Sequence, residues 1–189
     1  MTTLVIFSGL PGTGKSSLAG RLARELRWPL LCIDDLVARV PAQADSHFWD
    51  TQILSLLSLT EAQLKLGLSV LVDSVFMGMD RLHAQELTRR YDASFRPVYC
   101  YISDDRLWQQ RVTRRFDALQ NQQAVATWED IQRQREFFRP WEADTALFMD
   151  AAKPLDQNYA ALLDFVTRPD VQTEPLPVDH PLLKGSYHG

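Results

Sequence analysis

Hydrophobic and polar positions divide the chain into two kinds of segment that alternate. Short apolar runs bounded by turns or charges occupy residues 3–8, 30–33, 69–73, 97–102 and 146–149. Between them, apolar residues recur at helical spacing over residues 15–27, 47–66, 79–91, 104–119, 128–138 and 156–167. Alternating strands and helices are typical of an α/β fold. The pattern therefore predicts a parallel sheet of five strands wrapped by helices.

The chain changes character after Thr167. Residues 168–189 hold four prolines, few apolar residues and no periodicity. Such a composition does not build a packed core. We therefore expect one domain at residues 1–167 and an irregular tail at residues 168–189.

The bulk composition is that of an ordinary globular protein, with 46% hydrophobic and 23% charged residues among 189 and a net charge of −4. No apolar run approaches the roughly 20 residues of a membrane span, and no charged leader precedes the first strand, so we expect a cytoplasmic protein. The acidic balance argues against non-specific coating of nucleic acid. Cys32 and Cys100 fall in predicted strands and are interpreted as small core residues without a metal or redox role.

The first apolar run leads into a glycine-rich turn, Gly9-Leu-Pro-Gly-Thr-Gly-Lys-Ser16, followed by Ser17 and a predicted helix. The glycines permit a backbone path in which consecutive N–H groups surround phosphates. Lys15 reaches the β and γ phosphates, and the Ser16 hydroxyl is a ligand for Mg²⁺. This P-loop pattern predicts a nucleoside triphosphate site made by Gly9, Leu10, Pro11, Gly12, Thr13, Gly14, Lys15, Ser16 and Ser17.

Carboxylates close the next two predicted strands. Asp34 and Asp35 follow the second strand, at the edge where ligands of open α/β sheets bind. One of them can accept the proton of an attacking hydroxyl while the other contacts substrate, although both could instead cap the next turn. Asp73 ends the third strand and is predicted to hold Mg²⁺ with Ser16, the alternative being a loop cap.

The stretch 106–139 is rich in arginine. Arg111 and Arg115 lie four residues apart and share one helix face. A helix of this kind can fold over the phosphates as a lid, with Arg111 also contacting the nucleotide and either arginine offsetting charge during transfer. A solvated helix face is the alternative. Seven arginines fall in the stretch: Arg106, Arg111, Arg114, Arg115, Arg133, Arg135 and Arg139.

Together these motifs resemble the small P-loop kinases, a group that includes 5′-polynucleotide kinases, chloramphenicol phosphotransferase, zeta toxins and gluconate kinase. The resemblance also includes Val70-Leu-Val-Asp73 and Phe137-Phe-Arg-Pro-Trp-Glu142 and covers about residues 1–167. It implies a P-loop NTPase three-layer sandwich with the adenylate-kinase-like strand order 2-3-1-4-5 and a helical lid. It further implies ATP as donor, Asp34 as general base and a lid arginine at Arg111 or Arg115.

The acceptor side departs from the polynucleotide kinases. Those enzymes place an arginine two residues after the Asp pair, where this chain has Val37, and the nearest arginine is Arg39. Phe48, Trp49 and Phe76 could line an apolar acceptor pocket, although core packing explains Phe48 and Trp49 equally well. We therefore name Asp35, Arg39 and Phe76 as candidate substrate residues.

The leading hypothesis is an ATP- and Mg²⁺-dependent kinase that phosphorylates a hydroxyl of a small molecule. A nucleotide or 5′-hydroxyl polynucleotide kinase is the first alternative, with a nucleoside or an oligonucleotide 5′ end as acceptor. The second is an ATP-binding regulatory protein with little turnover, for which the proline-rich tail would be a docking segment.

Overall fold

The computed structural model of the chain describes residues 1–37, 48–119, 125–142 and 145–169. At its centre lies a parallel sheet of five strands in the order β2-β3-β1-β4-β5. The predicted fold class and strand order are therefore confirmed. The strands are β1 (Thr3–Ser8), β2 (Leu30–Cys32), β3 (Val70–Asp73), β4 (Ser94–Tyr101) and β5 (Leu147–Asp150).

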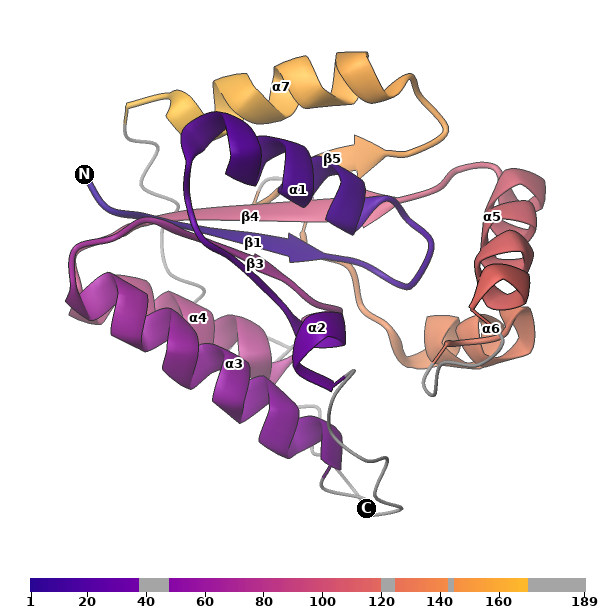
Figure 1. Cartoon of the computed structure of the whole chain (residues 1–189), viewed down its shortest axis with the longest axis horizontal. Coiled ribbons are helices and arrows are strands. Elements are labelled where there is room, and N and C mark those ends of the chain that lie inside the picture. Colours follow the sequence, from indigo (N-terminus) through magenta and orange to yellow (C-terminus); the bar gives the residue numbers. More distant parts are fainter. Residues whose placement is uncertain (38–47, 120–124, 143–144, 170–189) are drawn as a thin grey trace.

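Helices cover both faces of the sheet, which gives three layers. In Figure 1, α1 and α7 lie on one face, α3 and α4 on the other, and α5 and α6 beyond the carboxyl ends of the strands. The helices are α1 (Lys15–Leu26), α2 (Ile33–Val37), α3 (Phe48–Lys65), α4 (Met79–Arg90), α5 (Asp105–Ala118), α6 (Trp128–Phe137) and α7 (Leu155–Thr167).

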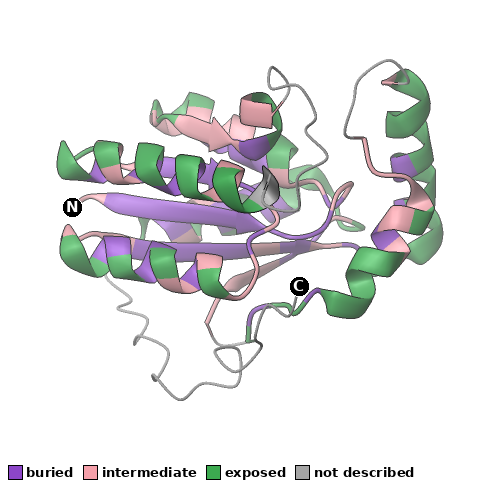
Figure 2. Ribbon diagram, turned by 90° about the horizontal axis from the view of Figure 1, so that it is seen from below, coloured by how far each residue is buried: buried purple, intermediate pink, exposed green. Residues whose placement is uncertain are grey.

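The central strand β1 is buried along its whole length. Successive side chains of a strand point to opposite faces, so Leu4 and Ile6 join the core under α3 and α4 while Val5 and Phe7 join the core under α1 and α7. Figure 2 shows the buried sheet between helices whose outer faces are exposed. Helix α3 packs inward at Leu56, Leu57, Thr60 and Leu64.

Strand β4 begins earlier than predicted, at Ser94 instead of residue 97, and contains Pro97. The short strand β5 pairs only with Val98–Tyr101, so the first half of β4 is bonded on one side, to β1. A proline lacks the N–H of a ladder bond and is tolerated where one side of a strand is free. The predicted start of the strand, at Pro97, was therefore three residues too late.

Cys100 is a core residue as expected, whereas Cys32 is only partly buried. Cys100 is buried in β4, and burial raises the pKa of its thiol to about 12. Cys32 is half-buried, and burial and then Asp73 raise its pKa to about 11. Neither thiol is ionised near neutral pH. Within the described residues, no helix is long and apolar enough to span a membrane.

Candidate active site

The P-loop turns tightly between β1 and α1. Gly9 has a φ of 136°, and a Cβ there would lie 2.1 Å from the carbonyl oxygen of Cys100. Gly12 has a φ of 82°, and a Cβ there would lie 2.9 Å from Val112 Cγ2 of α5. Any other residue would be strained at both positions and would also collide with β4 or α5. The glycine spacing read from the sequence therefore matches two close backbone approaches.

Lys15, Ser16 and Asp73 lie together where β1 and β3 end. Phe7 of β1 is in register with Asp73, whose carboxylate is 2% exposed. Burial raises the pKa of Asp73, while the Lys15 ammonium and a hydrogen bond from Ser16 lower it. Cys32 Sγ, 3.9 Å from Asp73 Oδ2, donates a further weak hydrogen bond. The hydroxyl of Ser16 and the carboxylate of Asp73 are oxygen donors of the kind that Mg²⁺ prefers, so these residues fit the predicted metal site.

Helix α5 is seated on the P-loop. Trp108, 4% exposed, donates a hydrogen bond from Nε1 to the carbonyl oxygen of Pro11 at 2.9 Å. Trp128 of α6 packs its ring edge-on against Trp108, with centroids 5.5 Å apart. Val112 lies against Gly12. The contact fixes where α5 stands relative to the bound phosphates that the P-loop motif predicts.

The inner face of α5 follows from helical spacing. Residues 108, 111, 112 and 115 repeat at three and four positions, which places them on one side of a helix. Trp108 and Val112 make the apolar contact with the P-loop, and Arg111 and Arg115 line a cleft of about 360 Å³ above Lys15 and Ser16. The structure therefore brings the two predicted arginines to the P-loop.

The far wall of this cleft was missed by sequence reasoning. It is formed by the segment that joins β5 to α7, with Ala151 and Lys153, and by the start of α7, with Leu155 and Asn158. Asn158 is buried and donates to the carbonyl oxygen of Asp150 at 2.8 Å. No local motif marks this segment. Its only signal was its place after the last strand of an α/β sheet, where ligands bind.

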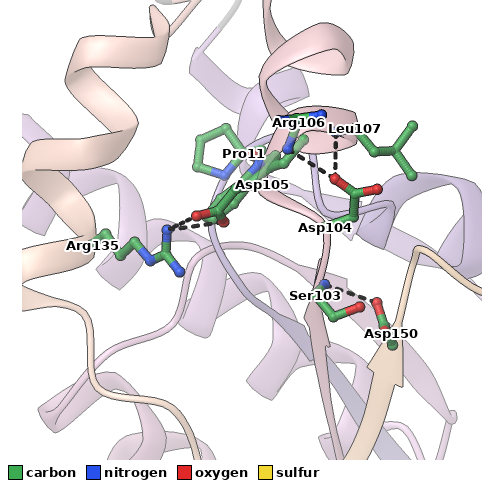
Figure 3. Close-up of polar contacts among 9 residues, drawn as sticks. Pro11, Ser103, Asp104, Asp105, Arg106, Leu107, Arg135 and Asp150 are labelled. Carbon is green, nitrogen blue, oxygen red and sulfur yellow. Dashed lines mark hydrogen bonds and ion pairs between the residues drawn. The ribbon is translucent and has the colours of Figure 1, made fainter.

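Asp150 joins this wall to the start of α5. Its Oδ1 accepts hydrogen bonds from the backbone N–H of Ser103, at 3.1 Å, and of Ala152, at 2.9 Å. Burial opposes the charged form, but a hydrogen bond from the Ser103 side chain and these backbone hydrogen bonds prevail and hold the pKa of Asp150 below its ordinary value. Figure 3 shows this contact beside Asp104, which caps α5, and the ion pair between Asp105 and Arg135 of α6.

The candidate base Asp34 lies in the first turn of the short helix α2, which the sequence did not predict as a separate helix. Its Oδ2 is 2.8 Å from Arg115 Nη2. Asp34 and Arg115 were predicted for different reasons, and the structure joins them. Asp35 follows on α2 and is exposed.

Of the candidate substrate residues, the two that the structure describes lie in different surroundings. Phe76 is 1% exposed and packs in the core beneath α3 and α4, so the expectation that it lines an acceptor pocket is not met. Arg39 lies outside the described residues, as do the side chains of Phe48 and Trp49. Asp35, next to Asp34 on α2, is exposed.

A buried arginine that sequence reasoning missed fixes the segment after α6. Arg81 is fully buried and donates from Nε to the carbonyl oxygen of Phe76 at 3.3 Å and from Nη1 to that of Pro140 at 3.2 Å. Its guanidinium stands 4.5 Å from the ring centroid of Trp141, and burial lowers its pKa to about 10. Arg81 thus connects the loop after β3, at Phe76, to the segment after α6, at Pro140.

The parallel sheet, the glycine-rich turn and the cationic cleft above it define a P-loop nucleotide-binding fold. A model of the AAA_33 family, described as an AAA domain, matches residues 4–141. The chain therefore belongs to this family. A comparison with curated protein sequences gives no match.

Solved structures share the fold over most of the chain. A protein from Chloroflexus aurantiacus j-10-fl assigned as a kinase has a TM-score of 0.67 at 24% identity, covering 87% of this chain and 93% of its own. Kti12 from Chaetomium thermophilum, in complex with ADP-AlF3, has a TM-score of 0.65 at 12% identity, with coverages of 87% and 100%. A gluconokinase from Sinorhizobium meliloti 1021 has a TM-score of 0.62 at 16% identity, with coverages of 87% and 91%. The resemblance to P-loop kinases thus holds for the fold, and the subgroup stays a prediction.

Proposed function

We propose that the protein is an ATP- and Mg²⁺-dependent kinase that transfers the γ-phosphoryl group of ATP to a hydroxyl of a small molecule. The observation that carries the proposal is the position of Asp34. Lys15, Arg111 and Arg115 line the cleft, and the carboxylate of Asp34 is 2.8 Å from Arg115, which brings it to the rim of the cleft. A site that only binds nucleotide needs no carboxylate there, whereas transfer to a hydroxyl needs a proton acceptor.

The donor half of the proposed site uses the P-loop and α5. The P-loop amides and Lys15 hold the β and γ phosphates, and α1 points its positive N-terminal end at them. Arg111 or Arg115 offsets the charge of the transferring group. Ser16 and Asp73 would hold Mg²⁺, which supplies positive charge to the phosphate oxygens when bound. The segment 151–158 would face the rest of the nucleotide, because it forms the other wall of the same cleft.

The acceptor half uses α2. The acceptor oxygen attacks the γ phosphorus, the bond from that phosphorus to the oxygen bridging to the β phosphate breaks, and ADP leaves. Asp34 takes the proton of the attacking hydroxyl. Asp35, next to it and exposed, is the candidate for contact with the acceptor. A gluconokinase among the structures that share this fold supports a small polar alcohol as acceptor.

A labelling experiment tests this function. The protein is incubated with [γ-³²P]ATP, Mg²⁺ and separate acceptors: sugars and sugar acids, nucleosides, 5′-hydroxyl oligonucleotides, and aminoglycoside or phenicol antibiotics. We expect label in one class of small molecule and a loss on the order of 100-fold in Lys15→Ala. Lys65→Ala, an exposed position at the end of α3, is the matched control.

The other outcomes contradict the proposal in distinguishable ways. Label on the 5′ end of an oligonucleotide would make the protein a polynucleotide kinase. Label found only in free phosphate, with tight ATP binding, would place it among ATP-binding regulatory proteins.

A further inference from the structure

The two arginines of the cleft have different surroundings. Arg111 lines the cleft with Lys15 and Ser16, and within residues 1–37, 48–119, 125–142 and 145–169 no carboxylate pairs with it. Arg115 lies one turn further along α5, and its Nη2 is 2.8 Å from Asp34 Oδ2. A guanidinium without a carboxylate partner is available to phosphate oxygens, whereas Arg115 is already engaged.

The ion pair of Arg115 and Asp34 spans the site. Asp34 follows β2 at one edge of the sheet, and Arg115 belongs to the helix that follows β4. In the order β2-β3-β1-β4-β5, the pair therefore crosses above the ends of β3 and β1, which carry Asp73 and the P-loop.

Of the two partners, Arg115 belongs to the helix that is more firmly packed. Helix α5 is held on the P-loop through Trp108 and Val112. Helix α2 has five residues, of which Ile33 is the buried one. The side chains of Arg115 and Asp34 are 43% and 55% exposed, and a half-exposed ion pair adds little to stability. Its main consequence is to orient the carboxylate.

We propose that the two arginines divide the work: Arg111 binds the phosphates of the nucleotide, and Arg115 is a positioning residue that orients Asp34. The inference rests on the proposed function, in which Asp34 is the base. Arg115 binds Oδ2 of Asp34, which leaves Oδ1 for the acceptor hydroxyl. Because α5 is seated on the P-loop, the same contact aligns the base with the nucleotide.

Binding of ATP alone separates the two roles without an acceptor. Isothermal titration calorimetry with Mg²⁺ and ATP should show affinity about tenfold weaker in Arg111→Gln, because a charged hydrogen bond to phosphate is lost. Arg115→Gln should stay within about twofold of the wild type. Arg114→Gln is the matched control, since Arg114 does not line the cleft and lies on another face of α5 with Arg106 and Asp117. An affinity loss in Arg115→Gln equal to that in Arg111→Gln would overturn the division of work.

Steady-state transfer then tests whether Arg115 acts through Asp34. Arg115→Gln should lower kcat about tenfold with an unchanged KM for ATP, and Arg115→Lys should recover part of that loss. In an Asp34→Asn background, the same Arg115→Gln change should cost less than about twofold. Losses that multiply would show that Arg115 acts without Asp34. The readout is the labelled acceptor or, with water as acceptor, released phosphate.

Failure of this inference differs from failure of the proposed function. If no acceptor is labelled, the kinase proposal is wrong, while the ATP affinities still decide whether Arg111 and Arg115 differ. If transfer depends on Lys15 and yet both arginines affect ATP binding alike, the kinase proposal stands and the division of work is wrong.

Discussion

The donor side and the acceptor rim of the cleft are built differently. On the donor side the main chain is fixed: Gly12 fits under α5, and the carbonyl oxygen of Pro11 is held by the buried Trp108. On the rim, Asp34 and Asp35 are exposed on a helix of five residues. One half-exposed ion pair joins this rim to α5.

The difference separates two tasks. Phosphates are recognised by backbone geometry, which tolerates little change, whereas an acceptor is recognised by side chains that can be exchanged at low cost to the fold. Changes where the P-loop packs against α5 should therefore lower both stability and ATP binding. Changes on the rim should lower transfer and leave the fold as it is.

The largest effect is expected where the two sides meet, at Asp73. Asp73→Asn should reduce transfer on the order of 100-fold, because an oxygen donor for the proposed Mg²⁺ loses its charge. Activity assays across Mg²⁺ concentrations measure this. Activity equal to the wild type would remove Asp73 from the proposed site.

The same change should stabilise the fold at neutral pH. Burial raises the pKa of Asp73 above its ordinary 3.8, so in the window above 3.8 the folded state binds the proton that the unfolded state has lost. Stability of the wild type therefore falls as the pH rises through that window. Urea unfolding should show Asp73→Asn more stable at pH 7, with the gap closing as the pH falls toward 3.8. A gap that grows on acidification would contradict this account.

Glycine substitutions test how tightly the donor side is packed. Gly12→Ala should cost about 3 kcal/mol of stability and weaken ATP binding, because its Cβ adds a collision with Val112 to the strained φ. Gly67, at φ 73°, has no atom within 4 Å of the place where a Cβ would lie, so Gly67→Ala isolates the backbone strain, about 1 kcal/mol. Urea unfolding and calorimetry compare the two. Equal losses of stability in the two variants would mean that α5 does not pack tightly against Gly12.

A smaller effect is expected from the hydrogen bond that seats α5. Trp108→Phe should cost about 2 kcal/mol, because the carbonyl oxygen of Pro11 loses its buried donor, and it should weaken ATP binding. Trp141→Phe removes a similar bond, to Ser8 Oγ at 2.7 Å, and is the matched control. Its stability should fall comparably with little change in ATP affinity. If both variants bind ATP alike, the Trp108 contact does not shape the P-loop.

The smallest effect on stability is expected at the rim. Asp34→Asn should change the free energy of unfolding by less than about 0.5 kcal/mol, since its ion pair with Arg115 is half-exposed. Urea unfolding checks this value. A loss of stability as large as that of Trp108→Phe would show that the rim contributes to stability as much as the donor side does.

Most of the donor side could be predicted from the sequence because its residues are contiguous. The glycine spacing, Lys15 and Ser16 lie in one turn after an apolar strand, and Asp73 is marked by the end of another. The contact of α5 with the P-loop also had a sequence signal, because Trp108, Arg111, Val112 and Arg115 are spaced to share one helix face. Of these four, only the two arginines were predicted to face the site. An apolar helix face by itself does not say what it packs against.

The rim and the far wall of the cleft were harder to predict from the sequence because they depend on long-range contacts. Asp34 and Arg115 are 81 residues apart, and their pairing follows from the strand order. Phe76 follows Asp73 closely in sequence, yet it turns into the core with a φ of 48°. The far wall at residues 151–158 carries no motif, so only its position in the folded sheet identifies it.

The most direct test of the central claim compares Asp34→Asn with Lys15→Ala in the [γ-³²P]ATP assay, with ATP affinity measured alongside. We predict that Asp34→Asn binds ATP within about twofold of the wild type and loses transfer on the order of 100-fold. Lys15→Ala should lose both binding and transfer. Full transfer by Asp34→Asn, with Lys15→Ala inactive, would contradict the claim that a donor side and an acceptor rim meet at this cleft.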